Sequence, residues 1–189
     1  MTSPSSVEGH ERIRLFAALP LPEGTVRRLA AWQHAELADA SDARIVPPGN
    51  LHVTLAFLGP RPAAELDGVV EALREAGRTG ERPVLMASGY KETRSVGMLV
   101  LDDEDGHATR LAESVGEGLE RLGVYRREAR RWLPHVTVLR FRRAPRLRPE
   151  VPDLGQVSPS EVALYHSVLR PTGAQYEILQ TVPLGGLTS

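Results

Sequence analysis

The sequence predicts an α+β protein with antiparallel or mixed sheets, and three observations support this prediction. Segments with the two-residue periodicity of strands outnumber the three segments with helical periodicity. Several strand segments follow one another without an intervening helix, which disfavours a doubly wound parallel sheet. A short motif occurs twice, at 51–59 and 134–141, near the middle of each half of the folded region. This duplication is expected if two similar lobes each supply one strand to a shared central cleft.

The first half of the chain is predicted to contain a strand, a helix and a motif strand. Residues 12–19 alternate apolar and other side chains, as a strand does, and prolines follow them. Residues 23–38 place apolar side chains on one helical face. The loop at 47–50 contains two prolines, whose fixed φ angles make it a stiff connection. It leads directly into the first motif strand, which we expect at 51–59.

The second half is predicted to contain two more helices and five more strands. The first of these helices carries apolar residues at i, i+3, i+4 and i+7, with Gly77 expected as its C-terminal stop. Asp105 is expected to cap the second helix. In chain order, the expected elements are a helix at 62–76, strands at 83–88 and 96–101 joined by a polar turn at 89–95, a helix at 105–122, the second motif strand at 134–141, an irregular connection at 143–159, and strands at 160–169 and 174–182.

The repeated motif is His-Val-Thr-(Leu/Val)-x-(Phe/Arg), and its two copies begin at His52 and His135, 83 residues apart. Because residues i and i+2 of a strand point to the same face, each copy presents an imidazole together with the hydroxyl of Thr54 or Thr137. A single histidine on a strand is more often a packed core residue, but the matched repetition favours a paired site. Two facing histidines can serve as general acid and general base, since imidazole titrates near neutral pH.

Composition excludes several classes of protein. The chain is 41% hydrophobic and 25% charged, which is ordinary for a globular protein, and it has no cysteine, so disulfides and thiolate sites are excluded. Serine hydrolase, P-loop and dinucleotide-binding motifs are missing. No apolar run approaches the roughly 20 residues needed to cross a bilayer. We therefore expect a cytoplasmic protein without membrane partners, with a disordered leader at 1–11, one bilobal domain at 12–182 and a tail at 183–189.

Positive charge is concentrated around the second motif, although the net charge of the chain is only −1. Between Arg121 and Arg148 there are ten arginines against one acidic residue, Glu128. Such a run is often a solvated basic surface. Its position beside a candidate site also makes it a candidate wall for binding a polyanion.

The two motifs favour phosphoryl chemistry without a metal. A metal site needs three or four convergent ligands, and two histidines with two threonines are a poor set. Threonine hydroxyls suit hydrogen bonding to phosphate oxygens instead, and a basic flank complements the same anion. We expect no metal and no cofactor. His166 shares a strand face with apolar residues, so we interpret it as a core histidine or one at the rim of the cleft.

On these residues the sequence resembles the two-histidine phosphoesterases, and specifically the RNA 2′,3′-cyclic phosphodiesterases once called 2′-5′ RNA ligases. The resemblance covers roughly residues 12 to 182 and rests mainly on the two His-x-Thr motifs. It implies two pseudo-symmetric lobes of antiparallel sheet, with helices outside and both histidines in a central cleft. It also implies catalytic His52 and His135, phosphate-binding Thr54 and Thr137, and a phosphate or ribose contact by Arg140.

The resemblance further implies the reaction, which is hydrolysis of a 2′,3′-cyclic phosphate at an RNA end to a 2′-phosphate, by a protein expected to be a monomer. His135 would be the base and His52 the acid. Possible base or ribose contacts are Phe16, Trp132, Tyr165 and His166. Two alternatives stay open: a cyclic phosphodiesterase acting on a small nucleotide or a 2′-5′ linked oligonucleotide, and a non-catalytic module that binds RNA ends.

Overall fold

The computed structural model describes residues 12–40, 42–171 and 173–185. Within them, one sheet of eight strands has the order β4-β5-β6-β3-β1-β7-β8, and β2 also pairs with β6. The strands are β1 (Arg12–Pro20), β2 (Ala43–Ile45), β3 (His52–Pro62), β4 (Met86–Glu92), β5 (Val96–Asp102), β6 (His135–Phe141), β7 (Glu161–Arg170) and β8 (Gly173–Pro183). The helices are α1 (Glu23–Glu36), α2 (Leu66–Thr79) and α3 (His107–Arg121), with short 3-10 helices η1 (Pro48–Asn50) and η2 (Ala63–Glu65).

The sheet consists of two lobes that meet at a single backbone pair. Val53 on β3 pairs with Val136 on β6, and no other pair in the described residues joins these two strands. One lobe contains β2, β4, β5 and β6; the other contains β1, β3, β7 and β8. Every pairing is antiparallel. This arrangement confirms the predicted α+β class with two lobes of antiparallel sheet.

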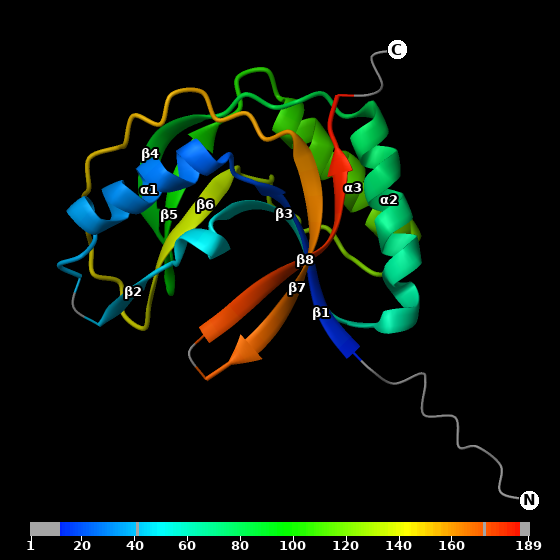
Figure 1. Cartoon of the computed structure of the whole chain (residues 1–189), viewed down its shortest axis with the longest axis horizontal. Coiled ribbons are helices and arrows are strands. Elements are labelled where there is room, and N and C mark those ends of the chain that lie inside the picture. The colour runs from blue at the N-terminus through cyan, green and yellow to red at the C-terminus, as the bar shows by residue number, and fades with distance from the viewer. Residues whose placement is uncertain (1–11, 41, 172, 186–189) are drawn as a thin grey trace, which may run out of the picture.

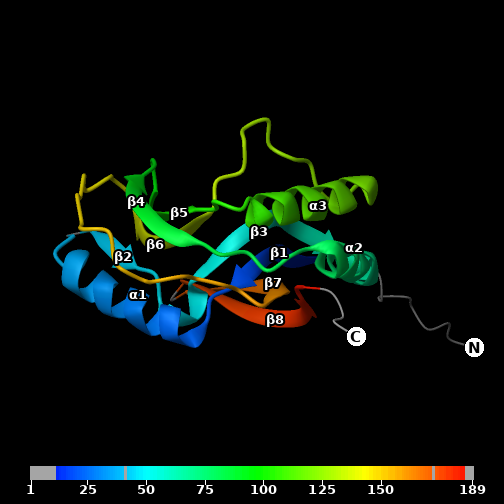
Figure 2. The ribbon, with the colours of Figure 1, turned by 90° about the horizontal axis from the view of Figure 1, so that it is seen from above.

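The three helices cover the outer face of the sheet (Figures 1 and 2). Helix α1 lies on the β6 lobe, where the Gln33 side-chain amide donates hydrogen bonds to the carbonyls of Val46 (3.1 Å) and Val138 (2.8 Å). Helices α2 and α3 pack against each other and against the other lobe. The helices thereby bury the core side of both motif strands and leave the opposite side of the sheet open.

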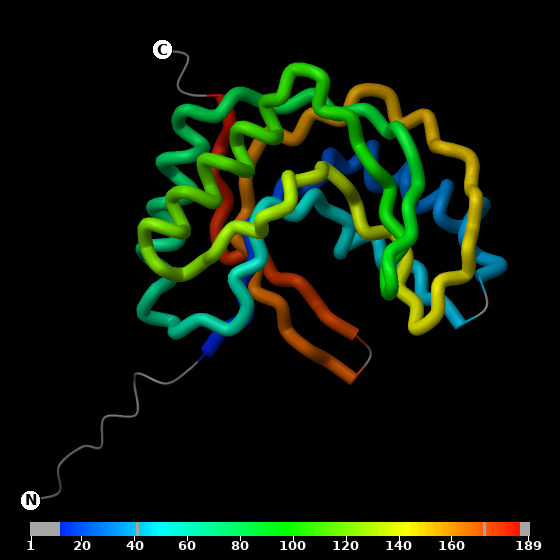
Figure 3. The backbone as a smooth tube through the Cα atoms, turned by 180° about the vertical axis from the view of Figure 1, so that it is seen from behind, coloured from blue at the N-terminus to red at the C-terminus, as the bar shows by residue number. Residues whose placement is uncertain are grey.

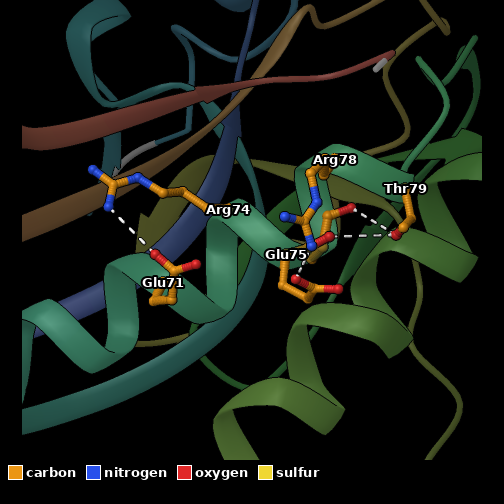
Figure 4. A network of polar contacts seen from close by, with 6 residues as sticks. Glu71, Arg74, Glu75, Arg78 and Thr79 are labelled. Carbon is orange, nitrogen blue, oxygen red and sulfur yellow. Dashed lines mark hydrogen bonds and ion pairs between the residues drawn. The ribbon is translucent and has the colours of Figure 1, made fainter. Parts of the chain in front are cut away.

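Helix α2 has the amphipathic pattern that its sequence predicts, but it does not end where expected. Val69 and Leu73 are completely buried, and the exposed side carries the ion pairs Glu71–Arg74 and Glu75–Arg78 (Figure 4). The prediction that Gly77 stops the helix is wrong, because the helix continues to Thr79. A Cβ atom on Gly77 would lie only 2.5 Å from Cγ1 of Val182, so the glycine allows α2 to approach β8 closely.

Two other local predictions are also corrected. The N-terminus of α3 is capped by Asp103 rather than Asp105, since its carboxylate accepts hydrogen bonds from the backbone amides of Ala108 (3.1 Å) and Thr109 (2.8 Å). Strand β4 includes residues 89–92, which were expected to form a turn, because they pair with β5. Pairing between strands has therefore overridden the turn propensity of this polar segment.

The described residues include the start of the predicted tail but not the predicted leader. The expected leader at 1–11 lies outside the described residues. Strand β8 reaches Pro183, so residue 183, expected in the tail, belongs to the sheet. In the part of the chain that the structure describes, no helix has the length and apolarity needed to cross a bilayer.

Candidate active site

The pair Val53–Val136 determines how the two motifs face each other. Both valines are buried in the core, so the histidine and threonine of each motif point to the open side of the sheet, as predicted. In an antiparallel register, this pair puts His52 across from Thr137 and Thr54 across from His135. The two His–Thr pairs are thereby related by an approximate twofold axis through the valines.

Each motif strand contains a β-bulge directly after its threonine. The β1–β3 register skips Leu55, and the β5–β6 register skips Val138. Because a bulge reverses the alternation of side chains beyond it, Phe57 and Arg140 lie on the open face three residues after their threonines. The bulges therefore give each His–Thr pair a third member: an aromatic ring in one lobe and a guanidinium in the other.

These side chains surround a cavity of about 410 Å³ on the open face. It is formed by residues from both lobes, namely Arg14, Phe16, Asn50, His52, Thr54, Phe57, Thr137, Arg140, Ser167, Leu169, Ala174 and Tyr176. His135 is half-buried at its edge and is not one of the lining residues. The cavity thus brings together four of the five expected catalytic and phosphate-binding residues, and His135 lies next to them through the β3–β6 register.

The β7–β8 hairpin supplies one wall of the cavity. Strand β7 pairs with β1 over only four residues of each strand and then diverges from it (Figures 1 and 3). The far part of the hairpin reaches η1, where the side-chain amide of Asn50 donates a 2.9 Å hydrogen bond to the carbonyl of Ala174. Ser167, Leu169 and Tyr176 line the cavity from this hairpin. Side chains from the end of the chain are therefore part of the site.

The environment of His52 favours a neutral imidazole in the unliganded site. Burial lowers its pKa to about 4, a backbone hydrogen bond at Asn50 opposes this shift, and the charges of Arg140 and His135 add to it. Its Nε2 atom lies 3.0 Å from Oγ1 of Thr54. The backbone hydrogen bond at Asn50 raises the pKa of His52, so the ring is its donor, and Nδ1 is the ring nitrogen left to donate it. Nε2 then accepts the bond from the Thr54 hydroxyl.

His135 is oriented by a matching backbone contact. Its Nδ1 atom lies 2.8 Å from the carbonyl of Leu133, which can only accept, so Nδ1 carries the proton. In the other lobe, His52 likewise has a hydrogen bond to the backbone of the residue two positions before it, Asn50. Fixing the tautomer in this way leaves the lone pair of Nε2 on His135 available as a base.

Of the residues expected to contact the nucleobase or ribose, only some lie at the cavity. Phe16 lines it and is stacked on Tyr165 behind it, with ring centroids 4.8 Å apart, and both rings are buried. Trp132 instead donates its indole N–H to the Thr54 carbonyl at 3.0 Å, which supports the first motif strand from the second lobe. His166 lies on the β7 face opposite the cavity-lining Ser167, with its Nδ1 3.9 Å from a carboxylate oxygen of Glu177 on β8.

Sequence reasoning missed Phe57 as a site residue. Its side chain is 49% exposed, although it lines the cavity, and the Arg14 guanidinium lies 5.0 Å from its ring centroid. The signal was present, because Phe57 and Arg140 occupy equivalent positions in the repeated motif. Tyr176 and Ser167 carried no comparable signal, since only the path of the hairpin brings them to the site.

The arginine run is not one continuous wall. It is divided by β6, with Arg126 to Arg131 in the loop before this strand and Arg142 to Arg148 after it. Within the first group, Arg127 pairs with Glu120 at 2.7 Å. Among the described residues, no three histidines or carboxylates lie close enough together to hold a metal ion.

Comparison with known proteins identifies relatives over nearly the whole chain. The family model of the LigT-like phosphoesterases matches residues 19–91. A Thermus thermophilus protein named RNA 2′,3′-cyclic phosphodiesterase is 33% identical over 187 residues, covering 92% of this chain and 91% of the relative. One of the same name from Archaeoglobus fulgidus is 31% identical over 181 residues, covering 89% of this chain and 98% of the relative.

Solved structures agree with these sequence relationships. The crystal structure of TT0787 from Thermus thermophilus has a TM-score of 0.79 and 30% identity, covering 92% of this chain and 99% of that one. Escherichia coli LigT, solved in complex with 3′-AMP, has a TM-score of 0.80 at 24% identity, which shows a common fold. On the identity and coverage of these relatives, the chain belongs to the LigT-like phosphoesterase family.

Proposed function

We propose that this protein hydrolyses 2′,3′-cyclic phosphate ends of RNA to 2′-phosphates, without a metal ion. The observation that carries the proposal is the facing arrangement of two His–Thr pairs about the Val53–Val136 pair, beside the charge of Arg140. The names of the relatives, RNA 2′,3′-cyclic phosphodiesterase, support this substrate. The single negative charge and compact shape of a cyclic phosphodiester suit the two threonine hydroxyls with the guanidinium of Arg140 beside them.

The phosphoryl group binds between the two motifs. The hydroxyls of Thr54 and Thr137 donate hydrogen bonds to its non-bridging oxygens, and Arg140 offsets the charge that grows on them in the transition state. When the Thr54 hydroxyl turns to the phosphate, its hydrogen bond to Nε2 of His52 must break. Substrate binding thereby frees the nitrogen that takes part in the reaction.

His135 acts as the base. Its Nδ1 proton is held by the Leu133 carbonyl, so the lone pair of Nε2 accepts a proton from water while the water oxygen forms its bond to phosphorus. The bond from phosphorus to O3′ breaks on the opposite side. O2′ keeps the phosphoryl group, and the product is a 2′-phosphate.

His52 acts as the acid and donates its proton to the departing O3′. Its pKa of about 4 in the unliganded site means that the free enzyme carries it neutral at pH 7. A bound phosphoryl anion offsets the charge of Arg140 and stabilises the imidazolium, which raises this pKa when the proton is needed. After the reaction His135 holds the extra proton and His52 has lost one, so exchange with solvent restores the starting state.

One experiment tests the proposal against both alternatives. The protein is incubated, with a chelator present, with an oligoribonucleotide ending in a 2′,3′-cyclic phosphate and separately with a cyclic mononucleotide. Turnover of the oligonucleotide at the higher kcat/KM supports the proposal. Turnover of the mononucleotide alone would indicate a small-nucleotide phosphodiesterase. Tight binding of the oligonucleotide without turnover would indicate an RNA-end binding module.

A further inference from the structure

Strand β2 exposes one arginine on the open face of the sheet. In the described chain, this strand of three residues pairs only with β6. Its outer residues, Ala43 and Ile45, are partly buried against the hydrophobic core, so the central residue, Arg44, points to the opposite side. Its partner in the register is Arg140, which lines the cavity. Arg44 therefore lies beside the phosphate-binding arginine, on the same face of the sheet.

Among the residues that the structure describes, this pair of arginines has no ion-pair partner. Like charges directly opposite each other on neighbouring strands destabilise a sheet, and their Cβ atoms are about 5 Å apart. Within the described residues, six other arginines form ion pairs with carboxylates, but neither Arg44 nor Arg140 does. On its other side Arg140 pairs with Val96, which is apolar. Two uncompensated guanidinium groups next to each other are an arrangement that a second anion would stabilise.

We propose that Arg44 binds the 5′-phosphate of the nucleotide that carries the cyclic phosphate. The inference rests on the proposed function, in which the cyclic phosphate lies at Arg140. In an RNA chain, the nearest other phosphate is the diester on the 5′ side of the same nucleotide. A guanidinium next to Arg140 is positioned for that group, whereas a nucleoside 2′,3′-cyclic phosphate has nothing to offer it. Arg44 thus makes the site prefer the end of an RNA chain over a cyclic mononucleotide.

The sharpest test compares two substrates that differ by one phosphate. The kcat/KM values of the wild type, Arg44→Gln and Arg44→Lys are measured with adenosine 2′,3′-cyclic phosphate and with its 5′-phosphorylated form. Arg28→Gln, which removes an exposed arginine from α1, is the matched control. A dinucleotide with the same cyclic end shows whether a diester replaces the monoester.

The wild type and the Arg28→Gln control are expected to favour the 5′-phosphorylated substrate by about fivefold in kcat/KM, as one partly exposed ion pair allows. In Arg44→Gln this ratio should fall to about one, and Arg44→Lys should recover part of it because it keeps the charge. For the dinucleotide, the slope of log KM against log salt concentration should be smaller by about 0.7 in Arg44→Gln than in the wild type. An unchanged ratio in folded Arg44→Gln would overturn the inference.

A binding measurement separates this inference from the proposed function. Calorimetry compares adenosine 2′-phosphate with adenosine 2′,5′-bisphosphate, which needs no turnover. Tighter binding of the bisphosphate by the wild type and by Arg28→Gln, but not by Arg44→Gln, supports the Arg44 site even if no cyclic phosphate is hydrolysed. Equal binding of both ligands by the wild type would contradict the site even if hydrolysis is fast.

Discussion

Acidification is expected to destabilise the folded protein through His52. Burial lowers the pKa of this imidazole from 6.5 to about 4. A group with a lower pKa in the folded state contributes stability that is fully present above its unfolded pKa and is lost as the pH falls towards its folded pKa. The unfolded chain binds the proton first, so the effect belongs to the interval between pH 6.5 and pH 4.

The magnitude follows from the two pKa values of His52. Relative to a pH well above 6.5, the loss in free energy of unfolding is RT ln[(1 + 10^(6.5 − pH))/(1 + 10^(4 − pH))]. This is about 2 kcal/mol at pH 5 and about 3 kcal/mol at pH 4. These values are upper bounds, because the ring keeps some exposure to the cavity. His52→Asn removes the imidazole. On acidification, the free energy of unfolding of this variant should therefore fall less than that of the wild type, and the difference should equal the loss given above.

Urea denaturation at several pH values between 7 and 4 measures this difference. The wild type and His52→Asn are compared with His34→Asn, which makes the same substitution at an exposed position on α1. The stability of the wild type relative to His52→Asn should fall by up to about 2 kcal/mol at pH 5 and up to about 3 kcal/mol at pH 4. His34→Asn should follow the wild type. Parallel curves for the wild type and His52→Asn would refute the assignment of a low pKa to this residue.

Four other predictions test the site and the packing. His52→Ala and His135→Ala should each lower kcat on a cyclic-phosphate substrate by about 10² or more, and circular dichroism should show that folding is retained. Full activity in either variant would remove that histidine from the mechanism. Activity should survive prolonged chelation, and loss with specific rescue by one divalent ion would contradict this. On a p-nitrophenyl phosphodiester, whose leaving group departs without protonation, His52→Ala should be largely rescued and His135→Ala should not; the reverse result would exchange the acid and the base. Gly77→Ala should lower the free energy of unfolding by about 1 to 3 kcal/mol, because the added Cβ would overlap Val182. Gly49→Ala should not lower it, since the space around that Cβ is open. Equal melting curves for the two variants would contradict the close packing of α2 on β8.

Periodicity predicted the parts of the site that local sequence controls. The alternation in the motif strands correctly placed His52, Thr54, His135 and Thr137 on one face, because the valines between them must enter the core. It could not predict the bulges. By strict alternation Arg140 would point into the core, and only the resemblance to known phosphoesterases assigned it to the site.

Features that depend on distant contacts were not predictable in the same way. The wall formed by β7 and β8 exists because the hairpin leaves β1 and reaches η1 through Asn50. Strand β2 is too short for a periodic signal and forms only because β6 offers it a partner. Gly77 has the same sequence signature as a helix stop, and only the position of Val182 shows that it is a packing residue.

The most direct test of the central claim is to identify the product formed in water enriched in heavy oxygen. An oligoribonucleotide ending in a 2′,3′-cyclic phosphate is treated with the wild type, and with His52→Ala and His135→Ala as controls. Phosphorus NMR and mass spectrometry then locate the phosphate and the label. We predict a 2′-phosphate as the single product, with one heavy oxygen on phosphorus, and little product from either variant. A 3′-phosphate, or a phosphate without the label, would contradict in-line attack of water with O3′ as the leaving group.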